Sequence, residues 1–210
     1  MNAISPLLRI TASVASVVCG SIAAASVAKV DVPVAVFKID QATVGSTTLD
    51  EVRKIYGSAE PARVSREEEA DVTICYVHRS PKGGVFVVFE SGVMGGYKQI
   101  TGFRLSTQGG SGHCVPTERD VGALATENGI ALGQALDDFR KAIPVSFKRR
   151  GRVLAYEGVT RRPATADELK QLRAAWPNER QYYYDVTTTV RATFNANRLV
   201  DLYVRKIESY

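Results

Sequence analysis

The chain has 210 residues, of which 45% are hydrophobic and 23% charged, and its net charge is +5 at pH 7. This hydrophobic content is that of a globular protein and excludes a chain that is disordered throughout. The basic excess is small, so charge alone does not indicate a nucleic-acid-binding protein. The length allows one domain or two.

The first 28 residues differ in composition from the rest of the chain. Arg9 is their only charged residue, Ile10 to Ala25 is a run of small and apolar residues, and Ser26-Val27-Ala28 offers small residues for cleavage. This pattern is typical of a secretory signal peptide. The run is rich in Ala and Ser and shorter than the roughly 20 strongly apolar residues of a transmembrane helix. We expect residues 1–28 to be removed and the mature protein to be periplasmic or secreted.

A short amphipathic helix is predicted after an extended lead-in. The valines that alternate over residues 30–39 indicate an edge strand or an extended segment. Thr48 and Glu51 then have the spacing of a capping box, which begins a helix. Gly57 supplies its C-terminal stop. The apolar residues between them fall on one face of this helix: Leu49, Val52, Ile55 and Tyr56.

Strands dominate the next fifty residues. The polar stretch 63–70 indicates an exposed turn, and three segments rich in β-branched and aromatic residues follow it: Val72 to Val77, Val85 to Glu90 and Gln99 to Leu105. Turn residues separate them, so this part of the chain predicts a three-stranded antiparallel meander.

The second half of the chain begins after a Gly-rich linker, residues 108–115. A short helix is predicted from Pro116, and a second amphipathic helix from Gln134 to Pro144. A strand is predicted at Val153 to Tyr156. A capping box at Thr165 and Glu168 then begins a helix that spans about residues 165–176. The final segments predict a hairpin, with one strand over residues 182–194 and the other over 199–207.

The two amphipathic helices share one phrase. Leu49-Asp50-Glu51-Val52-Arg53-Lys54 is echoed by Leu136-Asp137-Asp138-Phe139-Arg140-Lys141, and an apolar-Gly pair precedes each copy. Such a repeat indicates two copies of one small module. We therefore predict an α+β protein with a first module over residues 29–107 and a second over 116–210, the latter carrying the helix near 165–176 as an insertion.

Two cysteines remain after removal of the predicted signal peptide. Cys75 and Cys114 are an even pair, which in an oxidising compartment indicates a disulfide. Free thiols are one alternative. A metal site is the other, because His78 and His113 lie near the cysteines. However, Cys75 and His78 are three apart in a predicted strand and point to opposite faces.

The repeated core resembles a known family. A Gly-x-(small)-Leu-Asp-Glu/Asp-apolar-Arg-Lys pattern occurs at Gly45 to Gly57 and again at Gly133 to Pro144, with strands downstream at Tyr76 and Tyr156. This pattern is similar to that of the SmpA/OmlA (BamE) envelope lipoproteins and the β-lactamase inhibitor protein (BLIP) family. The resemblance covers most of residues 40–210 and implies tandem modules, each with a helical element packed on an antiparallel meander.

The chain departs from this family in two places. Val18 is too bulky for the lipobox expected before Cys19, which speaks against a lipoprotein role in outer-membrane protein assembly. The second module lacks a cysteine pair, whereas each half of the inhibitor resembles a disulfide-bridged unit. Inhibition of a β-lactamase is therefore not carried over.

No catalytic constellation is evident in the sequence, so we predict no enzymatic activity, no metal and no cofactor. The largest basic cluster is Lys148-Arg149-Arg150-Gly151-Arg152, joined by Arg161-Arg162. We interpret it as a solvated turn, with an anionic lipid headgroup or an acidic protein as the alternative. A nucleic-acid partner is not expected for an exported chain, and any membrane contact is at most peripheral.

The candidate site is the sheet face opposite the helices. An antiparallel sheet covered on one side leaves its other side for solvent or a partner. The residues predicted to line this binding surface are Phe86, Val88, Tyr183, Arg191, Tyr203 and Arg205. Tyr and Arg are enriched at binding hot spots. The alternative is that the two modules cover one another's sheets.

The predicted function is thus an exported, non-enzymatic protein-interaction module of the bacterial envelope. Its partner would be another envelope or extracellular protein. The alternative is a small periplasmic hydrolase or ligand-binding protein with a pocket between the modules.

Overall fold

The computed structural model describes residues 31–210 apart from 67–68, 81–82, 110–112 and 180–181. The predicted signal peptide, residues 1–28, lies outside the described residues. Within the described part of the chain, no helix is both long and apolar enough to span a membrane.

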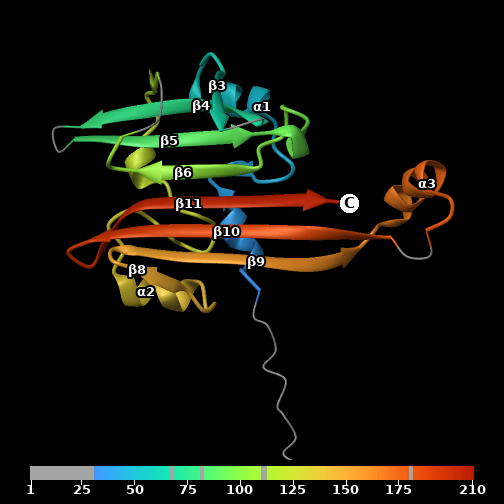
Figure 1. Ribbon diagram of the computed structural model, residues 1–210. Coiled ribbons are helices and arrows are strands. Elements are labelled where there is room, and N and C mark those ends of the chain that lie inside the picture. Colours follow the sequence, from blue (N-terminus) through green and yellow to red (C-terminus); the bar gives the residue numbers. More distant parts are fainter. Residues whose placement is uncertain (1–30, 67–68, 81–82, 110–112, 180–181) are drawn as a thin grey trace, which may run out of the picture.

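The fold is α+β and is built around one nine-stranded sheet (Figure 1). Eight strands follow one another across it, each antiparallel to its neighbours, in this order: β3 (Ala62–Arg66), β4 (Glu69–Ser80), β5 (Gly83–Ser91), β6 (Gly102–Ser106), β11 (Arg198–Ser209), β10 (Tyr183–Asn195), β9 (Val153–Pro163) and β8 (Lys148–Arg150). The ninth strand, β7 (Val115–Pro116), pairs in parallel with β4. A separate small sheet joins β1 (Lys38–Ile39) to β2 (Ala42–Thr43).

The strand order has a simple relation to the sequence. Strands β3 to β6 lie on one side of the sheet and β8 to β11 on the other, and each set runs from the sheet edge to the centre in chain order. The central strands β6 and β11 are hydrogen-bonded to each other. The sheet therefore passes without a break across the boundary predicted between two modules.

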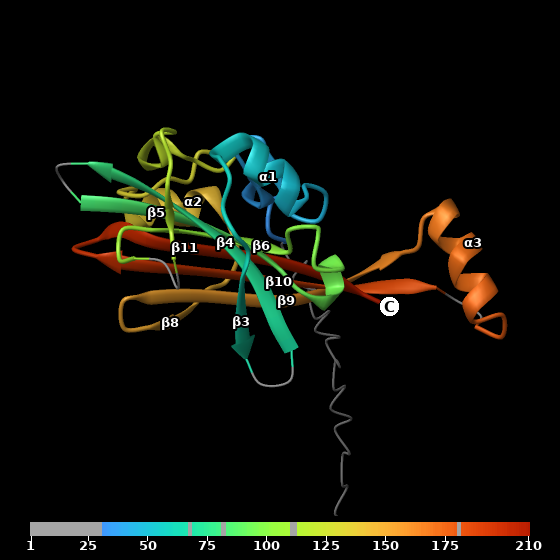
Figure 2. The same ribbon diagram turned by 90° about the horizontal axis from the view of Figure 1, so that it is seen from above.

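Helices α1 (Leu49–Tyr56) and α2 (Leu136–Ala142) lie on the same face of the sheet, as Figure 2 shows. Each has one buried face, in which Val52 and Phe139 are fully buried. The rings of Tyr56 and Phe89 are 5.3 Å apart, and those of Phe139 and Phe194 are 5.5 Å apart. The main core thus lies between these two helices and one face of the sheet.

Matching backbone hydrogen bonds hold the chain just before each helix. Gly45 N–H donates to the Ile100 carbonyl at 2.8 Å, and Gly133 N–H donates to the Leu199 carbonyl at 2.7 Å. Both glycines have a φ of +84°, which a residue with a Cβ adopts only at a cost. Ile100 and Leu199 return the contact, because their N–H groups donate to the carbonyls of Thr47 and Gln134, each at 2.9 Å. The repeated phrase therefore encodes the same local structure twice.

The third helix stands apart from the body of the molecule. Helix α3 (Ala166–Ala175) begins with the predicted capping box of Thr165 and Glu168. It joins the far ends of β9 and β10, which carry it away from the rest of the sheet (Figures 1 and 2). We refer to α3 and the strand ends that carry it as the arm.

Three local predictions were wrong. The lead-in forms a 3-10 helix, η1 (Val34–Phe37), because its apolar residues turn inward and bury Val36 and Phe37. The segment from Pro116 forms β7 and a second 3-10 helix, η3 (Val121–Ala123), because it pairs with the edge of β4. Part of the stretch read as a turn is β3, which pairs with an extended β4. One further 3-10 turn, η2 (Val93–Gly95), follows β5.

Candidate functional site

The sheet face opposite α1 and α2 carries all the residues predicted to form a binding surface. Strand pairing aligns one row of side chains across this face: Ala155, Arg191, Tyr203, Arg104, Val88 and Cys75. The next row contains Arg205, and the row on the other side contains Phe86. Tyr183 has the same alternation as Arg191 along β10.

These residues differ in exposure. Arg191 is exposed and the Tyr183 side chain is 39% exposed, whereas Val88 is only 7% exposed. Phe86, Tyr203 and Arg205 are half-buried. Of the six predicted residues, only Arg191 and Tyr183 are therefore exposed at the surface.

This face is hollowed into a groove of about 380 Å³. The side chains that line it are Val64, Asp71, Thr73, Val88, Glu90, Arg104, Val153, Arg191, Thr193, Asp201 and Tyr203. Val64 belongs to β3 and Val153 to β9, which are separated in the sheet by five strands. Two residues so distant in strand order border one hollow because the sheet curls around it. We call this face the concave face.

A buried charge network forms one side of the groove. The Tyr203 hydroxyl donates to Glu90 Oε1 at 2.7 Å. Arg205 lies between two carboxylates, with Nη2 3.4 Å from Asp71 Oδ1 and Nε 3.4 Å from Glu90 Oε1. Burial, together with the negative charge of Glu90, raises the pKa of Tyr203, so its hydroxyl stays protonated as a donor.

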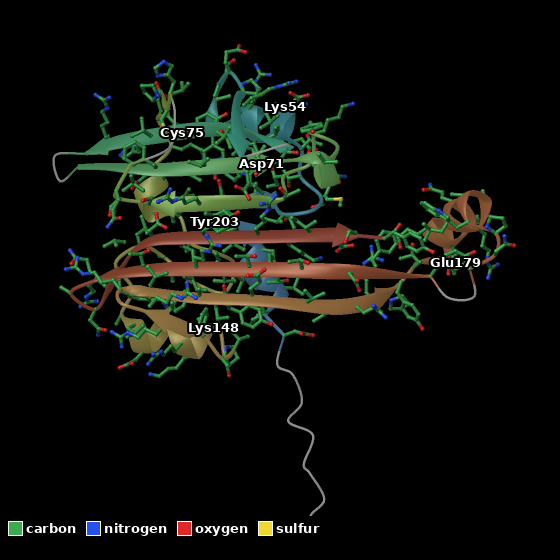
Figure 3. The ribbon with its side chains drawn as sticks, in the orientation of Figure 1. Lys54, Asp71, Cys75, Lys148, Glu179 and Tyr203 are labelled. Atoms are coloured by element: carbon green, nitrogen blue, oxygen red, sulfur yellow. A yellow bond between two sulfur atoms is a disulfide. The ribbon has the colours of Figure 1, made fainter. Side chains whose placement is uncertain are left out.

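A second ion pair lies on the groove floor. Arg104 Nε donates to Asp201 Oδ2 at 2.7 Å, and the Asp201 side chain is only 9% exposed. Figure 3 shows the setting: Tyr203 lies on a central strand, with Asp71 toward one edge of the sheet and Lys148 toward the other. Asp71, Glu90 and Asp201 thus each pair with an arginine of the same face.

The other side of the groove continues into a second hollow of about 520 Å³. Its lining includes Lys148, Arg150, Val153, Glu157 and Arg191. Val153 and Arg191 line both hollows, so the two adjoin.

The predicted basic cluster is divided by the structure. Successive side chains of β8 point to opposite faces of the sheet. Lys148 and Arg150 therefore line the concave face and Arg149 does not. Arg161 and Arg162 lie at the opposite end of β9 and bind carboxylates of the arm region instead. The prediction that they join the cluster was wrong, because the strand is long enough to separate them.

Cys75 and Cys114 form the predicted disulfide, with Cα atoms 4.5 Å apart. It ties β4 to the residue before β7 at one end of the concave face. Neither His78 nor His113 lines the groove. The Nε2 atom of His78 lies 3.9 Å from Oδ1 of Asp120. Among the described residues, no group of three or more His, Cys, Asp or Glu side chains could hold a metal ion.

Comparison of the chain with models of protein families, with curated proteins and with solved structures finds no match. The site is therefore interpreted from its own geometry.

Sequence reasoning missed the acidic residues of the groove: Asp71, Glu90 and Asp201. Arg205 and Asp71 are 134 residues apart, and Tyr203 and Glu90 are 113 apart. Alternation along each strand could assign these side chains to a face, but only the pairing of β6 with β11 brings them together.

Proposed function

We propose that this protein is an exported, non-enzymatic binding module that holds another protein on its concave face. The observation that carries the proposal is a single curved surface to which seven strands contribute, while α1 and α2 occupy the opposite face. A protein surface can fill such a groove with a loop. Arg191 in the groove lining, and Tyr183 farther along the same face of β10, offer side chains typical of hot spots.

We further propose that the chain consists of two copies of one BLIP/BamE-like module. The matching hydrogen bonds at Gly45 and Gly133 support this, as does the strand order, which repeats from each edge to the centre. The halves join edge to edge through β6 and β11, so neither covers the open face of the other.

The composition of residues 1–28 and the disulfide support export to the periplasm or the cell exterior. The partner would then be another envelope or extracellular protein.

A small-ligand site is the second candidate, because a 380 Å³ hollow has the size of many ligand pockets. As a hydrolase, however, the site has little support. Asp201 binds Arg104, Glu90 accepts from Tyr203, and neither histidine lies in the groove. General acid–base catalysis requires a group that can exchange a proton at the substrate.

Site-specific photo-crosslinking tests the proposal. A photoreactive residue at Arg191 reports on the concave face, and one at Lys54, which is labelled on α1 in Figure 3, reports on the helix face. With an envelope extract we expect a discrete protein adduct from position 191 and none from position 54. Equal adducts from both positions, or adducts from position 54 alone, would contradict binding through the concave face.

A further inference from the structure

The two sides of the concave face differ in charge. Near β4 and β5, Arg205 lies between the Asp71 and Glu90 carboxylates, and Glu90 also accepts a hydrogen bond from Tyr203. On the groove floor, Arg104 is paired with Asp201. Arg104 and Asp201 neutralise one another, whereas two carboxylates share Arg205, so this side of the groove has no excess positive charge to attract an anion.

The opposite side carries three exposed cations. Arg191, Lys148 and Arg150 line the second hollow, and within the part of the chain that the structure describes none of their side chains makes a hydrogen bond or ion pair. Glu157 is the one carboxylate in that lining. The second hollow therefore has an excess of positive charge.

Strand register explains why there is space between these cations. Arg191 on β10 is aligned with Ala155 on β9, and Ala155 is aligned with Lys148 on β8. Adjacent strands lie about 4.8 Å apart, so the Cα atoms of Arg191 and Lys148 are roughly 10 Å apart across a small residue. Two long cationic side chains at this spacing can both contact a carboxylate placed above Ala155.

We propose that this site, the Arg191 site, receives an aspartate or glutamate side chain from a protruding loop of the protein partner. The inference rests on the proposed function and adds the chemistry of the partner. Arg191 can bind a carboxylate through two N–H donors, and Lys148 adds a second charge. Polar, uncharged groups of the same loop then lie over the side of the groove that contains Asp71 and Glu90.

The shape and charge of the groove favour an acidic protein loop over other anions. A bilayer surface is flat and does not enter a concave face. A polyanion would extend from the Arg191 site over Asp71 and Glu90, two carboxylates that share one Arg205, and would be repelled there. A single carboxylate on a protein loop avoids that repulsion.

Selection from a displayed library of disulfide-closed loop peptides on the wild-type protein tests this inference. We expect the selected loops to share an Asp or Glu. Changing that residue to Asn or Gln in the loop should weaken binding about tenfold, the loss of one charged contact worth roughly 1.4 kcal/mol. The variants Arg191→Gln and Lys148→Gln should weaken it similarly, and Arg191→Glu should abolish it.

Arg173→Gln is the matched control, because Arg173 is an exposed cation of α3, outside the groove. Its binding should equal that of the wild type, and thermal unfolding of each variant checks that the fold is retained. Loops that bind at Val64 and Thr193 but show no acidic preference, and that bind Arg191→Gln normally, would overturn the inference while leaving the proposed function standing. Acidic loops weakened by Arg173→Gln and not by Arg191→Gln would also overturn it. If the library yields no loop that depends on groove residues, the proposed function itself fails.

Discussion

The two halves of the sheet share an element order but differ in cross-linking and in the pairing of their charges. The half made of β3 to β6 is cross-linked by Cys75 and Cys114, and its groove charges are paired with side chains of the central strand β11. The half made of β8 to β11 has no described disulfide, extends into the arm, and presents Arg191 and Lys148 to solvent. Under the proposed function, the first half supplies a cross-linked wall of the groove and the second half supplies the exposed cations that contact the partner.

The largest difference between the halves should appear when the disulfide is removed. The bond closes a loop with a sequence separation of 39, for which chain-entropy reasoning gives a stabilisation of roughly 4 kcal/mol. The double variant Cys75→Ser/Cys114→Ser should lower the free energy of unfolding in urea by about that amount. Hydrogen exchange should rise first in β4 and β5. A uniform rise over β9 and β10 instead would show that the halves do not differ in this way.

The two repeated glycines should respond alike. Gly45 and Gly133 both have a φ of +84° and open space where a Cβ would lie, so an alanine meets backbone strain and no clash. Each Gly→Ala variant should lose about 1–2 kcal/mol of stability. Asparagine, which adopts this conformation more readily, should cost less at both positions. Losses that differ between the sites by more than about 1 kcal/mol would contradict the equivalence of the halves.

The arm belongs only to the second half and should loosen independently. Arg162 donates to both carboxylate oxygens of Glu168 at 2.8 and 2.9 Å and to Glu208 at 2.7 Å, and it lies over the Tyr184 ring. Arg162→Ala should destabilise the arm by about 1 kcal/mol, the scale of a small ion-pair network.

Trp176 reports this change, because it is the only tryptophan and its ring lies 4.9 Å from that of Tyr210. Its fluorescence should shift to longer wavelength in Arg162→Ala. Lys170→Ala removes only an exposed pair with Asp167 and should leave the spectrum unchanged. A shift in the Lys170 variant equal to that in the Arg162 variant would contradict the assigned network.

Acid should have a smaller effect on the same arm. Hydrogen bonds from Arg162 and from the Thr165 cap lower the pKa of Glu168 to about 2. Because this folded-state pKa lies below the unfolded value, the stabilisation is present above about pH 4.5 and is lost as the pH falls toward 2. Trp176 fluorescence should therefore change with a midpoint near pH 2, and Arg162→Ala should move the midpoint toward 4.5. The same midpoint in both proteins would disprove the link.

The smallest expected effect is that of Arg191→Gln on the free energy of unfolding. Arg191 is exposed and its side chain makes no hydrogen bond or ion pair among the described residues, so Arg191→Gln should change the free energy of unfolding by less than about 0.5 kcal/mol. Urea denaturation checks this. A larger loss would indicate that Arg191 holds the fold together and is not free to bind.

Features encoded by neighbouring residues, such as helix starts and the alternation of side chains along a strand, were predicted from the sequence. Features that depend on pairing between distant segments were missed. Thr48–Glu51 and Thr165–Glu168 are capping boxes readable within four residues, and both helices begin there. Alternation placed Arg191 and Tyr203 on one face correctly. Strand β3 was missed because three of its five residues are polar. It also pairs mainly with the first residues of β4, which precede the apolar segment from which that strand was predicted. The groove could not be foreseen, because its curvature depends on the order of strands separated by more than a hundred residues.

The pairing of β6 with β11 has a further consequence for how a partner is recognised. Thr107, at the end of β6, still donates to the Val200 carbonyl, so the boundary between the halves is itself hydrogen-bonded sheet. Opening the groove would require this ladder to break. The concave face is therefore pre-organised. If it binds a loop as proposed, association should cost little conformational entropy of this chain. Affinity should then depend mainly on the shape and charge complementarity of the loop to the groove.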